Sequence, residues 1–162
     1  MSNIQNTDEK CQEIIDRLLT ISRQVPEGNI NRFFDKEVIG FDLQEQWIDF
    51  RFLADETKLN VIGTVHGGIM AGIADECMGF GAAALIGLED EVLTTADMQF
   101  NCLKAIRKGD ELRIRVRVRH AGKRTLITTA EIFREDVLVF MATENLARIP
   151  KSVVDPSSAV FR

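Results

Sequence analysis

The sequence predicts an α+β domain in which an antiparallel sheet packs against one long, buried helix. Two patterns carry this prediction. Residues 66–86 are rich in Ala, Gly and Met and almost free of charge, which is typical of a buried helix of about five turns. Four strand-like runs follow, at 91–103, 110–120, 124–134 and 137–148, with turn residues at their junctions. Because 162 residues are close to the usual length of one domain, we expect a single core.

The N-terminal part is expected to contribute a helix outside the sheet. Residues 6–23 carry apolar side chains at helical spacing, and Asn6 with Glu9 resembles a capping box at the helix start. The next residues, 25–34, contain Pro26 and several other turn-forming residues, so we interpret them as a linker.

The sheet is expected to begin soon after residue 36. Ile48, Phe50 and Phe52 recur with a period of two, as in a half-buried strand, and the residues around 41–45 predict a strand pair. The chain is therefore divided into an N-terminal helix and linker (1–35), the α+β domain (36–149) and an irregular tail (150–162).

Composition limits the functional classes. Apolar residues make up 45% of the chain and charged residues 28%, as in an ordinary soluble globular protein. A net charge of −5 disfavours nucleic-acid binding, which depends on Lys and Arg. The apolar stretches are shorter than a membrane span, and the polar N-terminal residues do not resemble a secretory signal. We therefore expect a cytoplasmic protein with no membrane and no nucleic-acid partner.

The cysteines and histidines indicate metal-independent chemistry. Cys11, Cys77 and Cys102 are an odd number without C-x-x-C spacing, so we expect buried, reduced thiols rather than disulfides or a zinc site. His66 and His120 lie far apart in the sequence, which disfavours a His-rich metal site.

Two carboxylates interrupt the apolar helix, and a buried carboxylate is costly unless it is paired or used. At 3.6 residues per turn, Gly68, Gly72, Asp75 and Gly79 share one stripe. Either a ligand approaches Asp75 closely there, or the glycines let another element pack tightly while Asp75 is salt-bridged. Glu76, about 100° further round the helix, is the alternative carboxylate.

The start of this helix is a second candidate feature. Gly67 and Gly68 lie where backbone N–H groups are unpaired and the helix dipole favours negative charge. Such a position is a natural oxyanion hole. The alternative is a glycine-rich helix start that only packs closely.

The spacing of these residues resembles the motif of a known family. Asn60 is followed after five residues by His66, Gly67 and Gly68, and Asp75 lies nine positions after His66. Together with the runs 95–98, 103–110 and 122–125, this pattern resembles the PaaI-like (phenylacetate-degradation-type) hotdog thioesterases. The resemblance extends from about residue 38 to 149.

The resemblance implies a hotdog fold, with a six-stranded antiparallel sheet wrapped around one long central helix and an extra N-terminal helix. It implies hydrolysis of a small acyl-CoA, aromatic or of short or medium chain, with coenzyme A as part of the substrate and no other cofactor. A homodimer that assembles to a homotetramer is expected, with sites at the dimer interface.

The family roles transfer to individual residues of this chain. The Gly67 N–H, beside Gly68, would polarise the thioester carbonyl. Asp75 of the other protomer would be general base or nucleophile. Water or substrate would be positioned by Asn60, His66 and Thr95, and coenzyme A phosphates would meet Lys123 and Arg124 at the last-but-one hairpin. Val61, Ala105 and Lys108 stand where the family often has proline, which affects loop stiffness.

Other functions rank lower. A Ser-His-Asp hydrolase is disfavoured because every serine lies in a terminal region and no G-x-S-x-G occurs. A nucleophile at Cys77 or Cys102 would need a basic partner. The alternating arginines of residues 113–119 predict a solvated strand face, with coenzyme A contact as the alternative. The runner-up function is a non-catalytic acyl-CoA-binding or regulatory hotdog module, and a hotdog dehydratase comes third.

Overall fold

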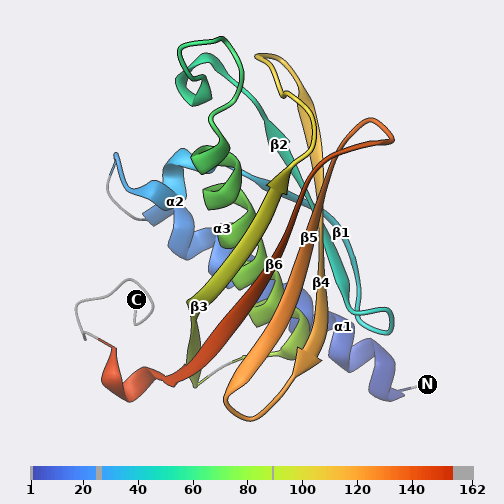
Figure 1. The fold of residues 1–162 in the computed structure, drawn as a ribbon. Helices are drawn as coiled ribbons and strands as arrows, with labels where there is room; N and C mark the ends of the chain where they lie inside the picture. The colour runs from blue at the N-terminus through green and yellow to red at the C-terminus, as the bar shows by residue number, and fades with distance from the viewer. Residues whose placement is uncertain (1, 25–26, 89, 155–162) are drawn as a thin grey trace.

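The computed structural model describes residues 2–24, 27–88 and 90–154. A six-stranded antiparallel sheet, in the order β1-β2-β4-β5-β6-β3, curves around the helix α3 (Figure 1). The helices are α1 (Ser2–Gln24), α2 (Ile30–Phe33) and α3 (Gly67–Ile86), and the strands are β1 (Glu37–Asp42), β2 (Trp47–Leu53), β3 (Glu91–Cys102), β4 (Glu111–Ala121), β5 (Thr125–Arg134) and β6 (Val137–Pro150). The predicted hotdog architecture is confirmed.

The long helix has clear start and stop signals. His66 is its N-cap, and Gly87 ends it in the left-handed conformation (φ 69°), which glycine adopts without a steric penalty. Contrary to the expectation that no segment is long enough, α3 has the length and apolar composition of a membrane span. Burial in the core accounts for this composition, because ten of its twenty residues are buried, including Ile73, Cys77 and Met78.

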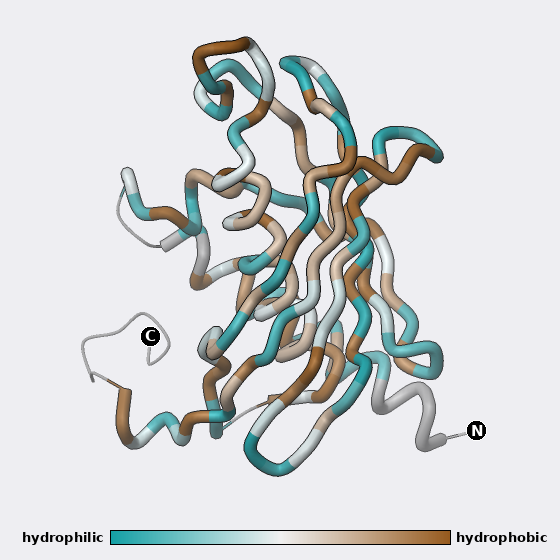
Figure 2. Tube along the Cα trace, viewed as in Figure 1, coloured by the Kyte–Doolittle hydropathy of each residue, from teal (hydrophilic) through white to brown (hydrophobic). Residues whose placement is uncertain are grey.

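The strands follow the predicted period of two. Ile48, Phe50 and Phe52 are buried on the face that packs on α3, and β4 contributes Ile114 and Val116 to the same core. Hydrophobic and hydrophilic residues alternate along the strands (Figure 2). The sheet and α3 therefore share one hydrophobic core.

The N-terminal region differs from the expectation at both ends. The helix begins at Ser2 rather than Asn6, so Asn6 lies inside it and the predicted capping box is wrong. The segment interpreted as a linker contains the short helix α2, which Asn29 caps by accepting a hydrogen bond from the Asn31 N–H. Val25 and Pro26 of that segment lie outside the described residues.

The C-terminal strand extends to Pro150, beyond the predicted end of its run at 148, and a short 3-10 turn, Lys151–Val153, follows. Most of the predicted tail, residues 155–162, lies outside the described part. At one edge of the sheet, β3 pairs only with β6, and its residues from Thr95 onward are largely exposed. This edge offers unpaired backbone groups to a further strand.

Candidate active site

A pocket of about 300 Å³ lies between α1, α3 and β3 and contains Asp75. Its walls are mostly apolar, with Leu18 and Ile21 from α1, Phe80 from α3 and Leu146 from β6. Polar and charged residues also line it, among them Arg17, Glu91 and Lys151. A concave pocket that combines apolar walls with placed polar groups is typical of a small-molecule site. The helix that the sequence placed outside the sheet therefore forms one wall of the pocket.

Asp75 is held by a hydroxyl group at one side of this pocket. Thr95 Oγ1 lies 2.6 Å from Asp75 Oδ1 and 2.7 Å from Glu144 Oε1. Thr95 sits beside a bulge in the β3–β6 pairing, between Thr95 and Asp97. Bulges occur often beside active sites, where they redirect a side chain.

Glu144 is a functional candidate that the sequence reasoning missed. It is fully buried on β6, and its Oε2 has no hydrogen-bond partner among the described residues. Burial, with a smaller contribution from the neighbouring Asp75, raises the pKa of Glu144 to about 8. The sequence contains a signal for it, because period-two alternation places Glu144 on the apolar face between Ala142 and Leu146.

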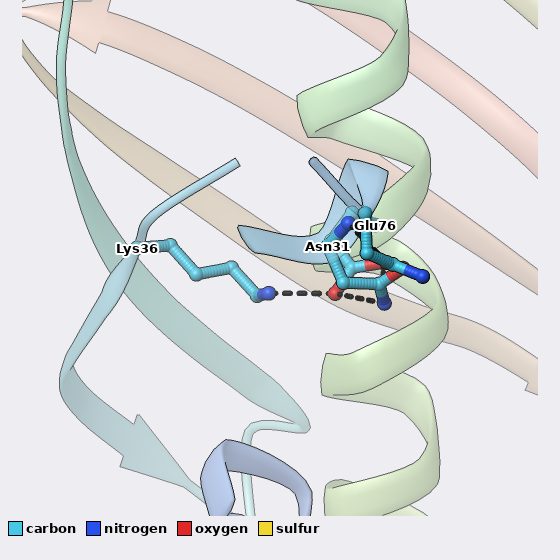
Figure 3. A network of polar contacts seen from close by, with 4 residues as sticks. Asn31, Lys36 and Glu76 are labelled. Carbon is cyan, nitrogen blue, oxygen red and sulfur yellow. Dashed lines mark hydrogen bonds and ion pairs between the residues drawn. The ribbon is translucent and has the colours of Figure 1, made fainter. Parts of the chain in front are cut away.

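The alternative carboxylate, Glu76, is already paired. Lys36 Nζ lies 2.6 Å from Glu76 Oε1, and Asn31 Nδ2 donates to both carboxylate oxygens at 3.1 and 3.0 Å. Figure 3 shows Lys36 and Asn31 reaching Glu76 on α3. Because an ammonium group and an amide already occupy this carboxylate, Glu76 is a poor candidate for a base, although it borders the same pocket.

At the start of α3, the two glycine N–H groups have different surroundings. His66 Nδ1 accepts a hydrogen bond from the Gly68 N–H at 2.9 Å, so this N–H is occupied. The Gly67 N–H has no hydrogen-bond partner in the described part of the chain. Gly67 therefore presents a free donor at a helix N-terminus, which suits a carbonyl or oxyanion.

Asn60 organises the loop before α3. Its Oδ1 accepts hydrogen bonds from the Ile62 and Thr64 N–H groups at 3.0 and 3.2 Å, and its Nδ2 donates to Thr64 Oγ1 at 2.9 Å. Val61, at a frequent proline position of the family, is fully exposed at the loop tip. Asn60 is thus tied into its own loop, with one amide hydrogen left for a ligand.

A second pocket of about 260 Å³ lies at the Gly67 end of α3 and includes Cys102 and Phe140. Gly67 and Asp75 line different pockets because they are eight positions apart along the helix, a rise of about 12 Å. Within one chain the structure therefore brings Thr95 to Asp75 and leaves Gly67 at the other pocket. Asn60 and His66 precede Gly67 in the sequence but line neither pocket.

Solved structures share this fold. The PaaI protein of E. coli, from the phenylacetic acid degradation operon, has a TM-score of 0.72 at 18% identity, covering 87% of this chain and 94% of its own. A putative phenylacetic acid degradation-related thioesterase of Ralstonia eutropha JMP134 has a TM-score of 0.70 at 21% identity, covering 81% and 98%. A Streptococcus mutans UA159 protein bound to acetyl-CoA has a TM-score of 0.65 at 21% identity, covering 73% and 91%.

The sequence comparisons give the family. No curated protein sequence matches this chain. Residues 62–140, which include α3 and Asp75, match the model of the thioesterase superfamily. This matched stretch, just under half of the chain, is similar to the thioesterase superfamily. The predicted thioesterase class is confirmed by this match.

The glycines on one face of α3 fit both interpretations of the sequence, close packing and space for a ligand. A Cβ at Gly72 would lie 2.5 Å from the Phe34 ring, so Gly72 permits close packing. A Cβ at Gly79 would have nothing within 4 Å, and Gly79 lines the pocket. Packing explains Gly72, whereas Gly79 leaves space for a ligand.

The two buried cysteines are not suited to nucleophilic catalysis. Cys11 and Cys77 are buried, and burial raises the pKa of both thiols, that of Cys11 to about 11. Cys102 is exposed, so the expectation of three buried thiols is wrong. The reason is its position on β3, the strand at the edge of the sheet. Within the described ranges, no group of three or more His, Cys, Asp or Glu residues could hold a metal ion.

The alternating arginines face away from α3. Arg115 forms a bidentate pair with Asp49 at 2.8 and 2.7 Å and lies over the Trp47 ring. These contacts support the predicted strand face rather than a phosphate site. Lys123 and Arg124 are exposed at the β4–β5 hairpin and line neither pocket.

Proposed function

We propose that the protein hydrolyses the thioester of a small acyl-CoA, with Asp75 as general base or nucleophile. The observation that carries this proposal is the placement of Asp75. Among the described residues, three carboxylates line the pocket, and two of them are paired, Glu76 with Lys36 and Glu91 with Arg148. Asp75 has no ion pair in the described part of the chain and contacts the Thr95 hydroxyl instead. The acetyl-CoA bound to the S. mutans protein of the same fold supports coenzyme A as the carrier.

The reaction needs two groups. A backbone N–H, here that of Gly67, donates a hydrogen bond to the thioester oxygen as negative charge develops on that oxygen. As a general base, Asp75 takes a proton from water while the water oxygen adds to the carbonyl carbon. The C–S bond then breaks, and the departing thiolate receives the proton from Asp75. As a nucleophile, an Asp75 carboxylate oxygen instead adds to the carbonyl carbon, and the C–S bond breaks as the coenzyme A thiolate departs. Water then cleaves the resulting anhydride into the free acid and the Asp75 carboxylate, and its remaining proton goes to the thiolate.

A second protomer supplies the missing half of this site. The rise between Gly67 and Asp75, about 12 Å, is too long for both to contact one carbonyl group. The exposed edge of β3 supports pairing with a second copy, since it carries both Thr95 and, at its far end, Cys102 next to Gly67. A two-fold axis across this edge would bring Gly67 of one protomer to Asp75 of its partner. We therefore propose a homodimer, and its further assembly to a homotetramer stays a prediction from the family resemblance.

The pocket beside Asp75 receives the acyl group in this proposal. Its apolar residues, among them Leu18, Ile21 and Phe80, suit an aromatic or a short or medium aliphatic chain. His66 and Asn60 would border the thioester from the other protomer. Lys123 and Arg124 are exposed cations that can contact the coenzyme A phosphates.

The test is release of free coenzyme A thiol from a panel of acyl-CoAs by the wild type and Asp75→Asn. We expect the variant to lower kcat by at least about 10²-fold, the contribution of a placed general base. Asp136→Asn, in the exposed β5–β6 turn, is the matched control and is expected to leave kcat unchanged. Binding of acyl-CoAs without turnover by the wild type would instead establish the non-catalytic module.

A further inference from the structure

The hydroxyl group of Thr95 contacts two carboxyl groups but has one hydrogen. It lies 2.6 Å from Asp75 Oδ1 and 2.7 Å from Glu144 Oε1, and both distances are those of good hydrogen bonds. The hydroxyl can donate to one carboxylate only. The second contact is a hydrogen bond only if the other carboxyl group is protonated and donates to Thr95. The geometry therefore requires one proton shared by the pair.

The environment places this proton on Glu144. Its side chain is fully buried and its second oxygen has no partner among the described residues, whereas Asp75 borders a pocket. An ionised carboxylate in such surroundings would be far more costly on Glu144. The groups that face Glu144 are Asp75 from α3, Thr95 from β3 and Thr128 from β5, and none of them is a cation.

We propose that Glu144 is a positioning residue that holds one proton and, through Thr95, keeps Asp75 ionised and oriented toward the pocket. The chain of donors runs from the Glu144 carboxyl group to Thr95 Oγ1 and from the Thr95 hydroxyl to Asp75 Oδ1. This inference rests on the proposed hydrolysis by Asp75. Glu144, a core residue of β6, thereby controls the orientation and ionisation of Asp75 on α3.

A pH dependence follows from this arrangement. When Glu144 loses its proton, the Thr95 hydroxyl can no longer hydrogen-bond both carboxylates. A second negative charge then faces Asp75 and opposes the negative charge that develops on the thioester oxygen. Activity is therefore expected to fall in alkaline solution around pH 8, where burial places the pKa of Glu144.

Two substitutions separate the proton from the side-chain shape. Glu144→Gln keeps the size of the side chain and a donor toward Thr95 but cannot titrate. We therefore expect its kcat near neutral pH to lie within about threefold of wild type, and its activity not to fall in alkaline solution. Glu144→Leu removes the donor, and we expect kcat to drop about tenfold or more with little change in KM, on the order of one lost orienting contact. Glu111→Gln, exposed at the start of β4, is the control and is expected to keep the wild-type pH profile.

A readout without substrate tests the pair directly. In protein labelled with ¹³C at glutamate carboxyl carbons, one signal is expected to titrate near pH 8, to vanish in Glu144→Gln, and to titrate at lower pH in Asp75→Asn. If this signal is present and no acyl-CoA is hydrolysed, the pair stands and the proposed function fails. If thiol is released but every glutamate titrates below pH 6, or Glu144→Gln keeps the alkaline fall, the role of Glu144 is overturned.

Discussion

Gly67 and Asp75 lie on one continuous helix, separated by a rise of about 12 Å, and they line two different pockets. The free N–H and the carboxylate of the proposed reaction therefore belong to two half-sites of each chain. This relationship makes the oxyanion donor and the base separately testable.

Gly67→Pro is expected to remove the proposed oxyanion donor while the fold is kept. Proline is tolerated at the first position of a helix, and His66 before it already has an extended conformation (ψ 133°). We expect kcat to fall by about 10²–10³-fold, the usual effect of one lost donor. Gly67→Ala retains the N–H and its Cβ would make an ordinary 3.5 Å contact with Cys102 Sγ, so it is the control. Equal activities of the two variants would remove the Gly67 N–H from the mechanism.

Mixed dimers of Gly67→Pro and Asp75→Asn are expected to regain activity. Random reassortment of equal amounts makes half of the dimers mixed, and each mixed dimer has one site with both lesions and one with none. Activity is then expected to recover to roughly a quarter of the wild-type value. The measurement is thiol release after denaturation and refolding of the mixture. Failure of verified mixed dimers to exceed the parent variants would mean that both residues act within one chain.

The stability of the protein is expected to depend on Glu144 and pH. Its pKa is about 8 in the folded protein against an ordinary value of 4.5, so between these values the folded state binds one more proton than the unfolded chain. The free energy of unfolding, relative to Glu144→Gln, is therefore greatest below about pH 4.5 and declines by about 1.4 kcal/mol per pH unit up to pH 8. Urea unfolding of both proteins from pH 5 to 9 measures this difference. A constant difference would show that Glu144 is ionised in the folded state.

The ion pair of Lys36 and Glu76 is expected to anchor the N-terminal segment to α3. The side chains are only 2% and 19% exposed, so Lys36→Met leaves a poorly solvated carboxylate and is expected to cost about 2–4 kcal/mol of unfolding free energy. The double variant Lys36→Met/Glu76→Gln removes both charges and is expected to recover part of this loss. Denaturant midpoints of Lys36→Met, Glu76→Gln and the double variant test this, and a double variant as unstable as the sum of the single variants would contradict the pairing.

Gly79→Ala is expected to stabilise the protein and to narrow the pocket. A Cβ there has nothing within 4 Å, and replacing a glycine inside a helix by alanine contributes about 0.5–1 kcal/mol. Gly72→Ala is the contrast, because its Cβ would lie 2.5 Å from Phe34, and it is expected to destabilise. Thermal melting tests the signs. For Gly79→Leu we expect KM to rise more for large than for small acyl groups, and an equal rise for all would place the acyl group elsewhere.

The sequence by itself determined the features that depend on local periodicity. The apolar stretch with its Gly87 stop fixes α3, and the period of two fixes strands such as β2 and β6. The spacing from Gly67 to Asp75 along a helix is set by the chain alone, which is why both residues could be named beforehand.

Contacts between distant segments were decided only by the tertiary structure. In the sequence, Thr95 is 49 residues from Glu144 and 20 residues from Asp75. The three side chains meet because the fold places β6 beside β3 and α3 across both strands. Lys36 likewise neutralises Glu76 from 40 residues away. Local residue patterns carry no information on which strands become neighbours, whereas the ionisation of a buried carboxyl group depends on those neighbours and on its distance from water.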